Sequence, residues 1–149
     1  MVSPHDPASY VLILAPLGKD GELAAKVLKE AGIISEVMKS ISELCERLKN
    51  LAATIIITEE ALNLEGIKKL YSCIQAQDEW SDLPIILITS EKKRLDQTRK
   101  IVDHFGELGN ISILERPFSV MTLVTLTKVA IRARNKQYRM RELLEILNK

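Results

Sequence analysis

The five residues Thr54-Ile55-Ile56-Ile57-Thr58 decide the fold class of this chain. All five are β-branched, and β-branched side chains suit the pleated surface of a strand better than the interior of a helix. The run contains no alternation of polar and apolar residues, which a strand with one face in water would need. We therefore predict a central strand that is buried on both faces, as is typical of a parallel sheet covered by helices.

Four further strand-sized runs lie on either side of this segment. Two are continuous apolar stretches, at residues 10–15 and 83–89, and two are shorter, at residues 33–37 and 110–114. Pro84 is tolerated close to the start of its strand, where a missing backbone N–H does little harm. The chain thus offers five strands, most of them apolar throughout.

Helical spacing of apolar residues fills the segments between these strands. We expect a helix from Asp20, which can cap it, to Gly32, and a second from the capping box Ser40-Ile41-Ser42-Glu43 to about Leu48. A third helix is expected to carry Ile67, Leu70, Tyr71 and Ile74 on its inner face. A fourth covers residues 92–105, and the last runs from Ser119 to the chain's end. Five strand–helix units joined by right-handed crossovers predict an α/β fold with helices on both faces of an open sheet.

Length and composition limit the class of protein. With 149 residues the chain forms one domain, and 21 Lys and Arg against 20 Asp and Glu give no field that favours nucleic acid or membrane as a partner. Cys45 and Cys73 lack the spacing of a zinc site and are expected as apolar residues of a reducing compartment. Residues 1–9 form a flexible lead-in without the features of a signal peptide, so we expect a cytoplasmic protein. No motif predicts catalysis, a metal ion or a cofactor.

Several motifs occur in a recognisable order. Leu-Pro opens the fourth strand and Thr89 closes it, Glu115-Arg116-Pro117-Phe118 follows the fifth, and Leu123 lies in the last helix. Over residues 10–134 the chain resembles a response regulator receiver domain. Trp80-Ser81-Asp82-Leu83-Pro84 and Arg132-Ala133-Arg134 are also similar to receiver-like domains found ahead of bacterial sensor histidine kinases. The resemblance implies a flavodoxin-like (CheY-like) three-layer sandwich with strand order 2-1-3-4-5.

The resemblance also implies a chemistry that this chain does not support. Receivers transfer a phosphoryl group to an aspartate after strand three, with Mg²⁺ held by that aspartate and two acidic residues after strand one. The matching positions here are Ala15 and Pro16 after strand one, and Thr58, or Glu59 in a register shifted by one, after strand three. We therefore predict a pseudo-receiver that binds no metal and is not phosphorylated.

Two further pocket positions keep polar groups. Thr89 matches the hydroxyl after strand four, and Arg116 replaces the lysine after strand five, keeping its charge with a planar fork geometry. Glu59 and Glu60 either place a permanent negative charge near Arg116 and Thr89, imitating phosphorylation, or are solvated loop residues. Two alternatives stay open: a phosphoacceptor that uses Asp20 or Glu59, and a sensor that binds a small ligand at the strand ends.

The last helix continues past the point where a receiver ends. A three–four spacing typical of a coiled-coil seam is formed by Leu123, Leu126, Ala130, Ala133, Gln137, Met140, Leu144 and Leu147. We expect Val120, Val124, Thr127 and Ile131 to pack on the sheet, and Lys128, Arg132, Arg134, Lys136, Arg139 and Arg141 to form a solvated flank. Residues 135–149 then have no core of their own. They predict a parallel homodimer whose helix continues into a kinase or sensor domain, the expected protein partner.

Overall fold

The structure is a computed structural model of the chain, and it describes residues 10–16, 19–49, 52–76, 82–90, 103 and 110–148. Within these ranges, five parallel strands form one sheet: β1 (Val11–Leu14), β2 (Ser35–Met38), β3 (Thr54–Thr58), β4 (Pro84–Ser90) and β5 (Asn110–Arg116). Their order is β2-β1-β3-β4-β5. The predicted fold class and strand order are confirmed.

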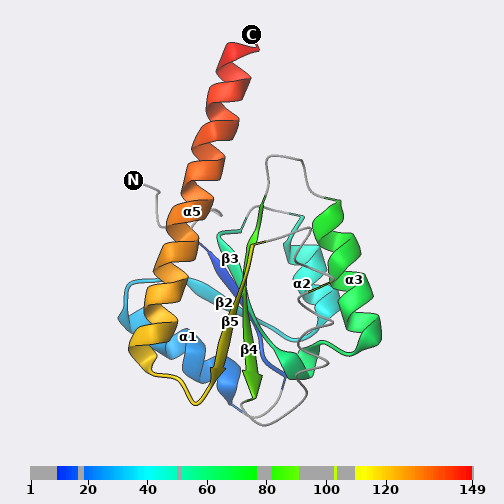
Figure 1. Cartoon of the computed structure of the whole chain (residues 1–149), viewed down its shortest axis with the longest axis vertical. Helices are drawn as coiled ribbons and strands as arrows, with labels where there is room; N and C mark the ends of the chain where they lie inside the picture. The colour runs from blue at the N-terminus through cyan, green and yellow to red at the C-terminus, as the bar shows by residue number, and fades with distance from the viewer. Residues whose placement is uncertain are drawn as a thin grey trace.

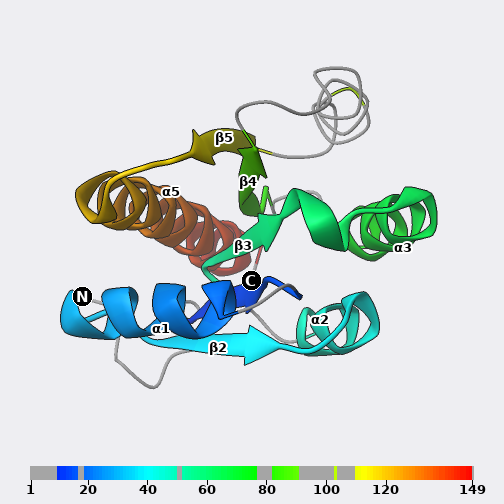
Figure 2. The same cartoon turned by 90° about the horizontal axis from the view of Figure 1, so that it is seen from below.

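Helices cover both faces of this sheet. They are α1 (Asp20–Glu30), α2 (Ile41–Arg47), α3 (Leu64–Gln75) and α5 (Val120–Leu147), and a short 3-10 helix, η2 (Glu59–Ala61), follows β3. Seen along the strands in Figure 2, α1 and α5 lie on one side of the sheet and α2 and α3 on the other. Apart from residue 103, the helix expected over residues 92–105 lies outside the described residues.

The uninterrupted apolar runs are explained by this three-layer arrangement. All residues of β1 and β3 are buried. Successive side chains of a strand point to opposite faces, so Ile55 and Ile57 pack in the core under α2 and α3, whereas Ile56 packs in the core under α1 and α5. A polar residue at any of these positions would be buried on one side or the other.

The local end signals of the first two helices are largely confirmed. Gly32 follows α1 with a φ of 79°, a conformation that glycine adopts without strain. The hydroxyl of Ser40 accepts a hydrogen bond from the amide of Glu43 at 3.1 Å, as a capping box requires. The reciprocal contact differs, because the Glu43 carboxylate accepts from the amide of Lys39 at 3.4 Å and not from that of Ser40.

The face of α5 that contacts the sheet agrees only in part with the prediction, because Thr127 is buried and Ile131 packs against the core as expected, whereas other residues differ. Its buried residues are Leu123, Thr127, Ala130, Arg134 and Tyr138. Leu123 and Ala130 had been assigned to a free seam and Arg134 to a solvated flank, whereas Val120, expected in the core, is 59% exposed. The Thr127 hydroxyl donates to the carbonyl of Leu123 at 2.8 Å, which makes its burial tolerable. Only Thr127 among the four residues predicted to pack on the sheet is fully buried.

Polar contacts fasten the middle of α5 to the amino ends of β3 and β4. Arg134 Nε and the Tyr138 hydroxyl both donate to the carbonyl oxygen of Ala52, at 3.0 and 2.8 Å. The side-chain amide of Gln137 accepts from the backbone N–H of Asp82 at 2.7 Å and donates to its carbonyl at 2.6 Å. Gln137, which was expected in the seam, therefore contacts its own domain, and the contacts of α5 with the strand layer extend to Tyr138, beyond Arg134.

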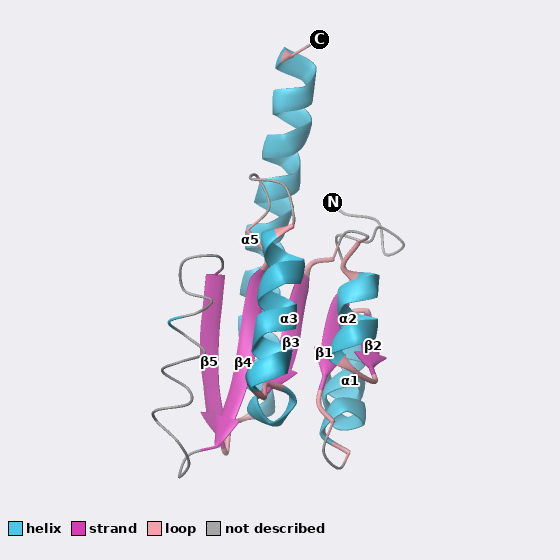
Figure 3. Ribbon diagram, turned by 90° about the vertical axis from the view of Figure 1, so that its right-hand side faces the viewer, coloured by secondary structure: helices cyan, strands magenta, loops and turns pink. Residues whose placement is uncertain are grey.

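Beyond Tyr138 the helix leaves the rest of the molecule. In Figures 1 and 3 the carboxyl-terminal part of α5, which is red in Figure 1, extends past the amino ends of the strands. Met140, Leu144 and Leu147 of the predicted seam are 55%, 47% and 77% exposed there. No helix within the described residues is both long enough and apolar enough to span a membrane.

Candidate functional site at the carboxyl ends of the strands

The register of the sheet brings the predicted pocket residues to one edge. Leu14 pairs with Ile57, and Thr58 pairs with Ile88. Ala15, which follows Leu14, is therefore level with Thr58. One strand further along, Thr89 pairs with Glu115 and Ser90 with Arg116, so these residues lie just beyond Thr58 at the same edge.

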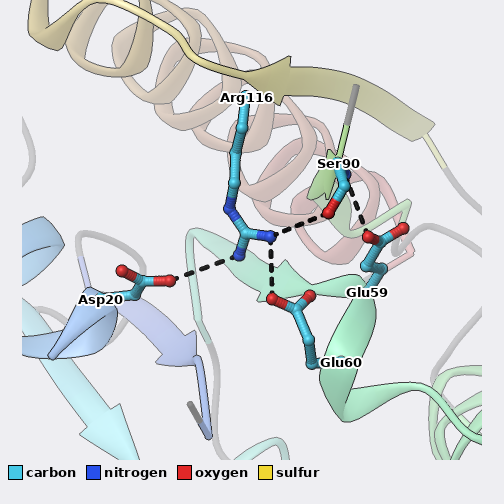
Figure 4. Close-up of polar contacts among 5 residues, drawn as sticks. All are labelled: Asp20, Glu59, Glu60, Ser90 and Arg116. Carbon is cyan, nitrogen blue, oxygen red and sulfur yellow. Dashed lines mark hydrogen bonds and ion pairs between the residues drawn. The ribbon is translucent and has the colours of Figure 1, made fainter. Parts of the chain in front are cut away.

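Arg116 is the centre of a polar cluster at this edge (Figure 4). Its Nη1 lies 2.8 Å from Glu60 Oε1 and its Nη2 lies 3.3 Å from Asp20 Oδ2, so two carboxylates from different elements hold one guanidinium. Nη1 also donates to the hydroxyl of Ser90 at 3.5 Å. The Arg116 side chain is 28% exposed, which leaves the ion pairs only partly screened by water.

Glu59 is the third carboxylate at this edge, and it contacts the backbone of Ser90. Its Oε1 accepts a hydrogen bond from the backbone N–H of Ser90 at 3.0 Å. Ser90 is the last residue of β4, and η2, which holds Glu59 and Glu60, follows β3 directly. The two glutamates therefore face the ends of β4 and β5, and neither is a purely solvated loop residue.

Asp20 serves the cluster and not its own helix. The N-cap of α1 is Lys19, and no side chain caps the helix. The prediction that Asp20 caps α1 was therefore wrong. Its carboxylate is at the first turn, where negative charge is favourable, and it reaches Arg116 on β5.

The remaining pocket positions carry no charge. Ala15 is half-buried and Pro16 is exposed. Thr58 is 2% exposed, and its hydroxyl has no hydrogen-bond partner in the described part of the chain. Thr89 is equally buried at 2%, and the hydroxyl that contacts Arg116 is that of its neighbour, Ser90. Ser90 was missed by the sequence comparison, which assigned the hydroxyl role to Thr89 alone.

These side chains do not fit a magnesium ion. Mg²⁺ prefers carboxylate oxygens in near-octahedral geometry, and the three positions that would supply them hold Ala15, Pro16 and Thr58. Asp20 and Glu60 are engaged with Arg116, whose positive charge opposes a nearby cation. In the part of the chain that the structure describes, no group of three or more His, Cys, Asp or Glu residues is placed to hold a metal.

A cavity of about 430 Å³ opens beside the cluster, between α1, α5 and the sheet. Its polar lining residues are Asp20, Thr58 and Arg116, and the rest of its wall is apolar. Leu23 and Val120, which are 58% and 59% exposed, lie among the lining residues, at the start of each helix.

Comparisons with known proteins identify the fold. No family model matches the sequence, and no curated protein matches it. The receiver domain of the Francisella response regulator 1452 superposes with a TM-score of 0.65 at 20% identity, over 84% of this chain and 98% of that one. This chain has the fold of a response regulator receiver domain.

Two further solved structures give similar TM-scores. A CheY-like receiver domain protein from Methanospirillum hungatei JF-1 gives a TM-score of 0.68 at 12% identity, over 87% of this chain and 98% of that one. NtrX from Brucella abortus, solved in complex with ADP, gives 0.71 at 14% identity over 94% of this chain. This chain spans only 30% of the NtrX chain, so the match concerns one part of that protein.

Proposed function

We propose that this chain is a signalling module with a receiver fold that acts through protein contacts and is not phosphorylated. One observation carries the proposal. Arg116 and the backbone N–H of Ser90, which lie where the resemblance to receivers expects a phosphoryl group to be held, already bind the carboxylates of Glu60 and Glu59. The strand-end site is thus satisfied by the protein's own anions.

The local charge supports this proposal. Arg116 contributes one positive charge, whereas Asp20, Glu59 and Glu60 contribute three negative ones. A phosphoryl group adds roughly −1.5 to −2 more at neutral pH. Without a divalent cation, that group would be repelled at short range inside a partly buried cluster.

An anion-binding experiment tests whether Glu59 and Glu60 occupy the groups that would otherwise hold a phosphate. Glu59→Gln with Glu60→Gln removes the charged partners of the Ser90 amide and of Arg116 Nη1, and leaves the Arg116–Asp20 ion pair in place. We expect the double variant to bind inorganic phosphate at least about tenfold more tightly than the wild type, since hydrogen bonds to a charged group are each worth about 1.5–3 kcal/mol. The measurement is a phosphate titration followed by the amide signal of Ser90 in NMR spectra.

A charge-matched control separates a local effect from a change in net charge. Glu22→Gln with Glu30→Gln removes the same two charges from exposed positions of α1. This control should bind phosphate no better than the wild type. Equal phosphate affinity in the wild type and the Glu59/Glu60 variant would show that the two glutamates do not block phosphate binding.

The free end of α5 supports the dimer as the form in which the module acts. Met140, Leu143, Leu144, Ile146 and Leu147 are all 47% exposed or more, and Met140, Leu144 and Leu147 keep the four–three spacing of a coiled-coil seam. A second copy of this chain would cover them in a parallel pair. The predicted seam is thereby shortened to the residues beyond Tyr138, since Ala130 and Gln137 contact their own domain.

Leu144→Glu is expected to break this dimer. Each dimer would lose two buried leucines, at about 1.5–3 kcal/mol each, so the dissociation constant should rise at least about a hundredfold. Sedimentation at tens of micromolar measures the change. Lys136→Glu, at an exposed position nearer the body, is the control and should leave the dimer intact. A wild-type protein that is entirely monomeric at this concentration would contradict the dimer.

The partner follows from the same helix. A helix that extends past the amino ends of the strands is suited to carry a second domain. We propose a histidine kinase or sensor domain at the carboxyl end of α5. This module itself would have no enzymatic activity, and its place would be the cytoplasm. The rival role, phosphate acceptance by Asp20 or Glu59, is disfavoured because both carboxylates are already engaged.

A further inference from the structure

The cavity beside the Arg116 cluster has the form of a small-molecule site. Its volume of about 430 Å³ is within the range of ligand pockets. Its wall includes Ile13, Ile56 and Ile88 from the sheet, Ala24 and Val27 from α1, and Leu123 from α5. Apolar side chains from two layers, the sheet and the α1/α5 layer, therefore converge on one space at the carboxyl ends of the strands, where open α/β sheets bind ligands.

Thr58 supplies the polar contact that such a site needs. Thr58 lines the cavity, and its buried hydroxyl has no hydrogen-bond partner among the described residues. A buried hydroxyl without a partner is costly, and native proteins rarely keep one without a reason. A ligand group that bonded to Thr58 would remove this cost.

The charges at the site select against an acid. Arg116 is the cation that lines the cavity, and it is already paired with Asp20 and Glu60. A carboxylate ligand would find no unpaired positive charge there and would lie close to two carboxylates. A charged amine would lose its hydration among the apolar side chains of the wall.

We propose that this cavity binds an uncharged, largely apolar small molecule that carries one hydroxyl group, with the apolar body between α1 and α5 and the hydroxyl at Thr58. A hydroxyl can both donate to and accept from the Thr58 oxygen. The site is independent of the function proposed above, because it uses Thr58 and the apolar wall and needs no change in the contacts of Glu59 and Glu60.

The test uses three compounds of one shape. Full-length protein labelled at isoleucine methyls is titrated with 4-ethylphenol, ethylbenzene and 4-ethylbenzoate. We expect saturable shifts of the Ile13, Ile56 and Ile88 methyls with 4-ethylphenol, weaker binding of ethylbenzene and no binding of the benzoate. Ile146, which is 64% exposed at the free end of α5, is the internal control and should not respond.

Two variants link binding to the cavity. Thr58→Val keeps the β-branched shape and removes the hydroxyl, so 4-ethylphenol should bind about threefold to tenfold more weakly while ethylbenzene is unaffected. Ala24→Leu fills the cavity from α1 and should abolish binding of both compounds with the methyl spectrum otherwise retained.

The same titrations can overturn the proposal. It fails if the three isoleucine methyls show no saturable shift, if Ile146 responds instead, or if the benzoate binds as well as the phenol. Unchanged binding of 4-ethylphenol to the Ala24→Leu variant would equally exclude this cavity. None of these results depends on whether the domain accepts a phosphoryl group.

Discussion

Replacing Arg134 with alanine is expected to lower the free energy of unfolding by about 3 kcal/mol. Arg134 is 1% exposed, its Nε donates to the Ala52 carbonyl at 3.0 Å, and its guanidinium carbon lies 4.7 Å from the centre of the Tyr138 ring. Its burial lowers the pKa of the group, so the folded protein tolerates the charge only because these contacts offset the desolvation. The variant loses a charge-assisted hydrogen bond and leaves a cavity under α5.

Urea-induced unfolding measures this loss, and the same helix provides a control. Arg132 is exposed two residues earlier, so Arg132→Ala should change the free energy of unfolding by less than about 0.5 kcal/mol. Arg134→Lys should recover little of the loss, because an ammonium can neither stack on Tyr138 nor contact Ala52 and Gln137 with the same fork. Equal stability of the Arg132 and Arg134 variants would show that α5 is not fastened by this side chain.

The second large expected effect is a gain of phosphorylation. In a variant with Ala15→Asp, Pro16→Asp and Thr58→Asp, we expect phosphorylation by acetyl phosphate in the presence of Mg²⁺ to become at least ~100-fold faster than in the wild type. The register aligns Ala15 with Thr58 on neighbouring strands, about 4.8 Å apart, so the new carboxylates can share one cation. That cation would offset the repulsion between the phosphoryl group and Glu59 and Glu60.

Charge must be separated from shape in this experiment. Asparagine at the same three positions has nearly the same size as aspartate, supplies neither the negative charge nor a nucleophilic carboxylate oxygen, and should leave phosphorylation at the wild-type level. Mass spectrometry of the intact protein follows the reaction. If the aspartate variant binds Mg²⁺ but stays unmodified, the lost carboxylates are not the reason for the missing chemistry.

The fold could be predicted from sequence because its signals are local and repeated. A run such as Thr54–Thr58 has only one comfortable place in a soluble domain, in the middle of a covered sheet, and Gly32 and Ser40 mark helix ends through contacts within one turn. The resemblance to receivers then fixed the strand order.

The orientation of α5 could not be predicted in this way. Apolar spacing gives weight to Leu126 and Ala133 and none to Arg134, yet Arg134 is fully buried because a backbone carbonyl far away in the sequence, at Ala52, accepts from it. Gln137 fits a coiled-coil position equally well until Asp82 is placed beside it. Contacts between such distant residues leave no periodic signal along the chain.

The predicted pocket residues lie together at the strand ends, but only part of their contacts could be expected from sequence. Sequence placed Arg116, Glu59 and Glu60 near one another and left open whether the glutamates are engaged or solvated. The geometry shows both engaged, and it adds Asp20 and Ser90. Asp20 was expected to cap α1, a common role for an aspartate at the start of a helix. Ser90 was overlooked because Thr89, its neighbour, matches the hydroxyl position of receivers.

The most direct test of the central claim is a phosphorylation assay on the wild-type protein. The full chain is incubated with acetyl phosphate and Mg²⁺, and the intact mass is followed over time, with the aspartate variant as a positive reference. The expected result is an unchanged mass, because Ala15, Pro16 and Thr58 supply no carboxylate to hold the cation and Glu59 and Glu60 already take the groups that would bind the phosphoryl. A stoichiometric, acid-stable and base-labile adduct on Asp20 or Glu59 would contradict it.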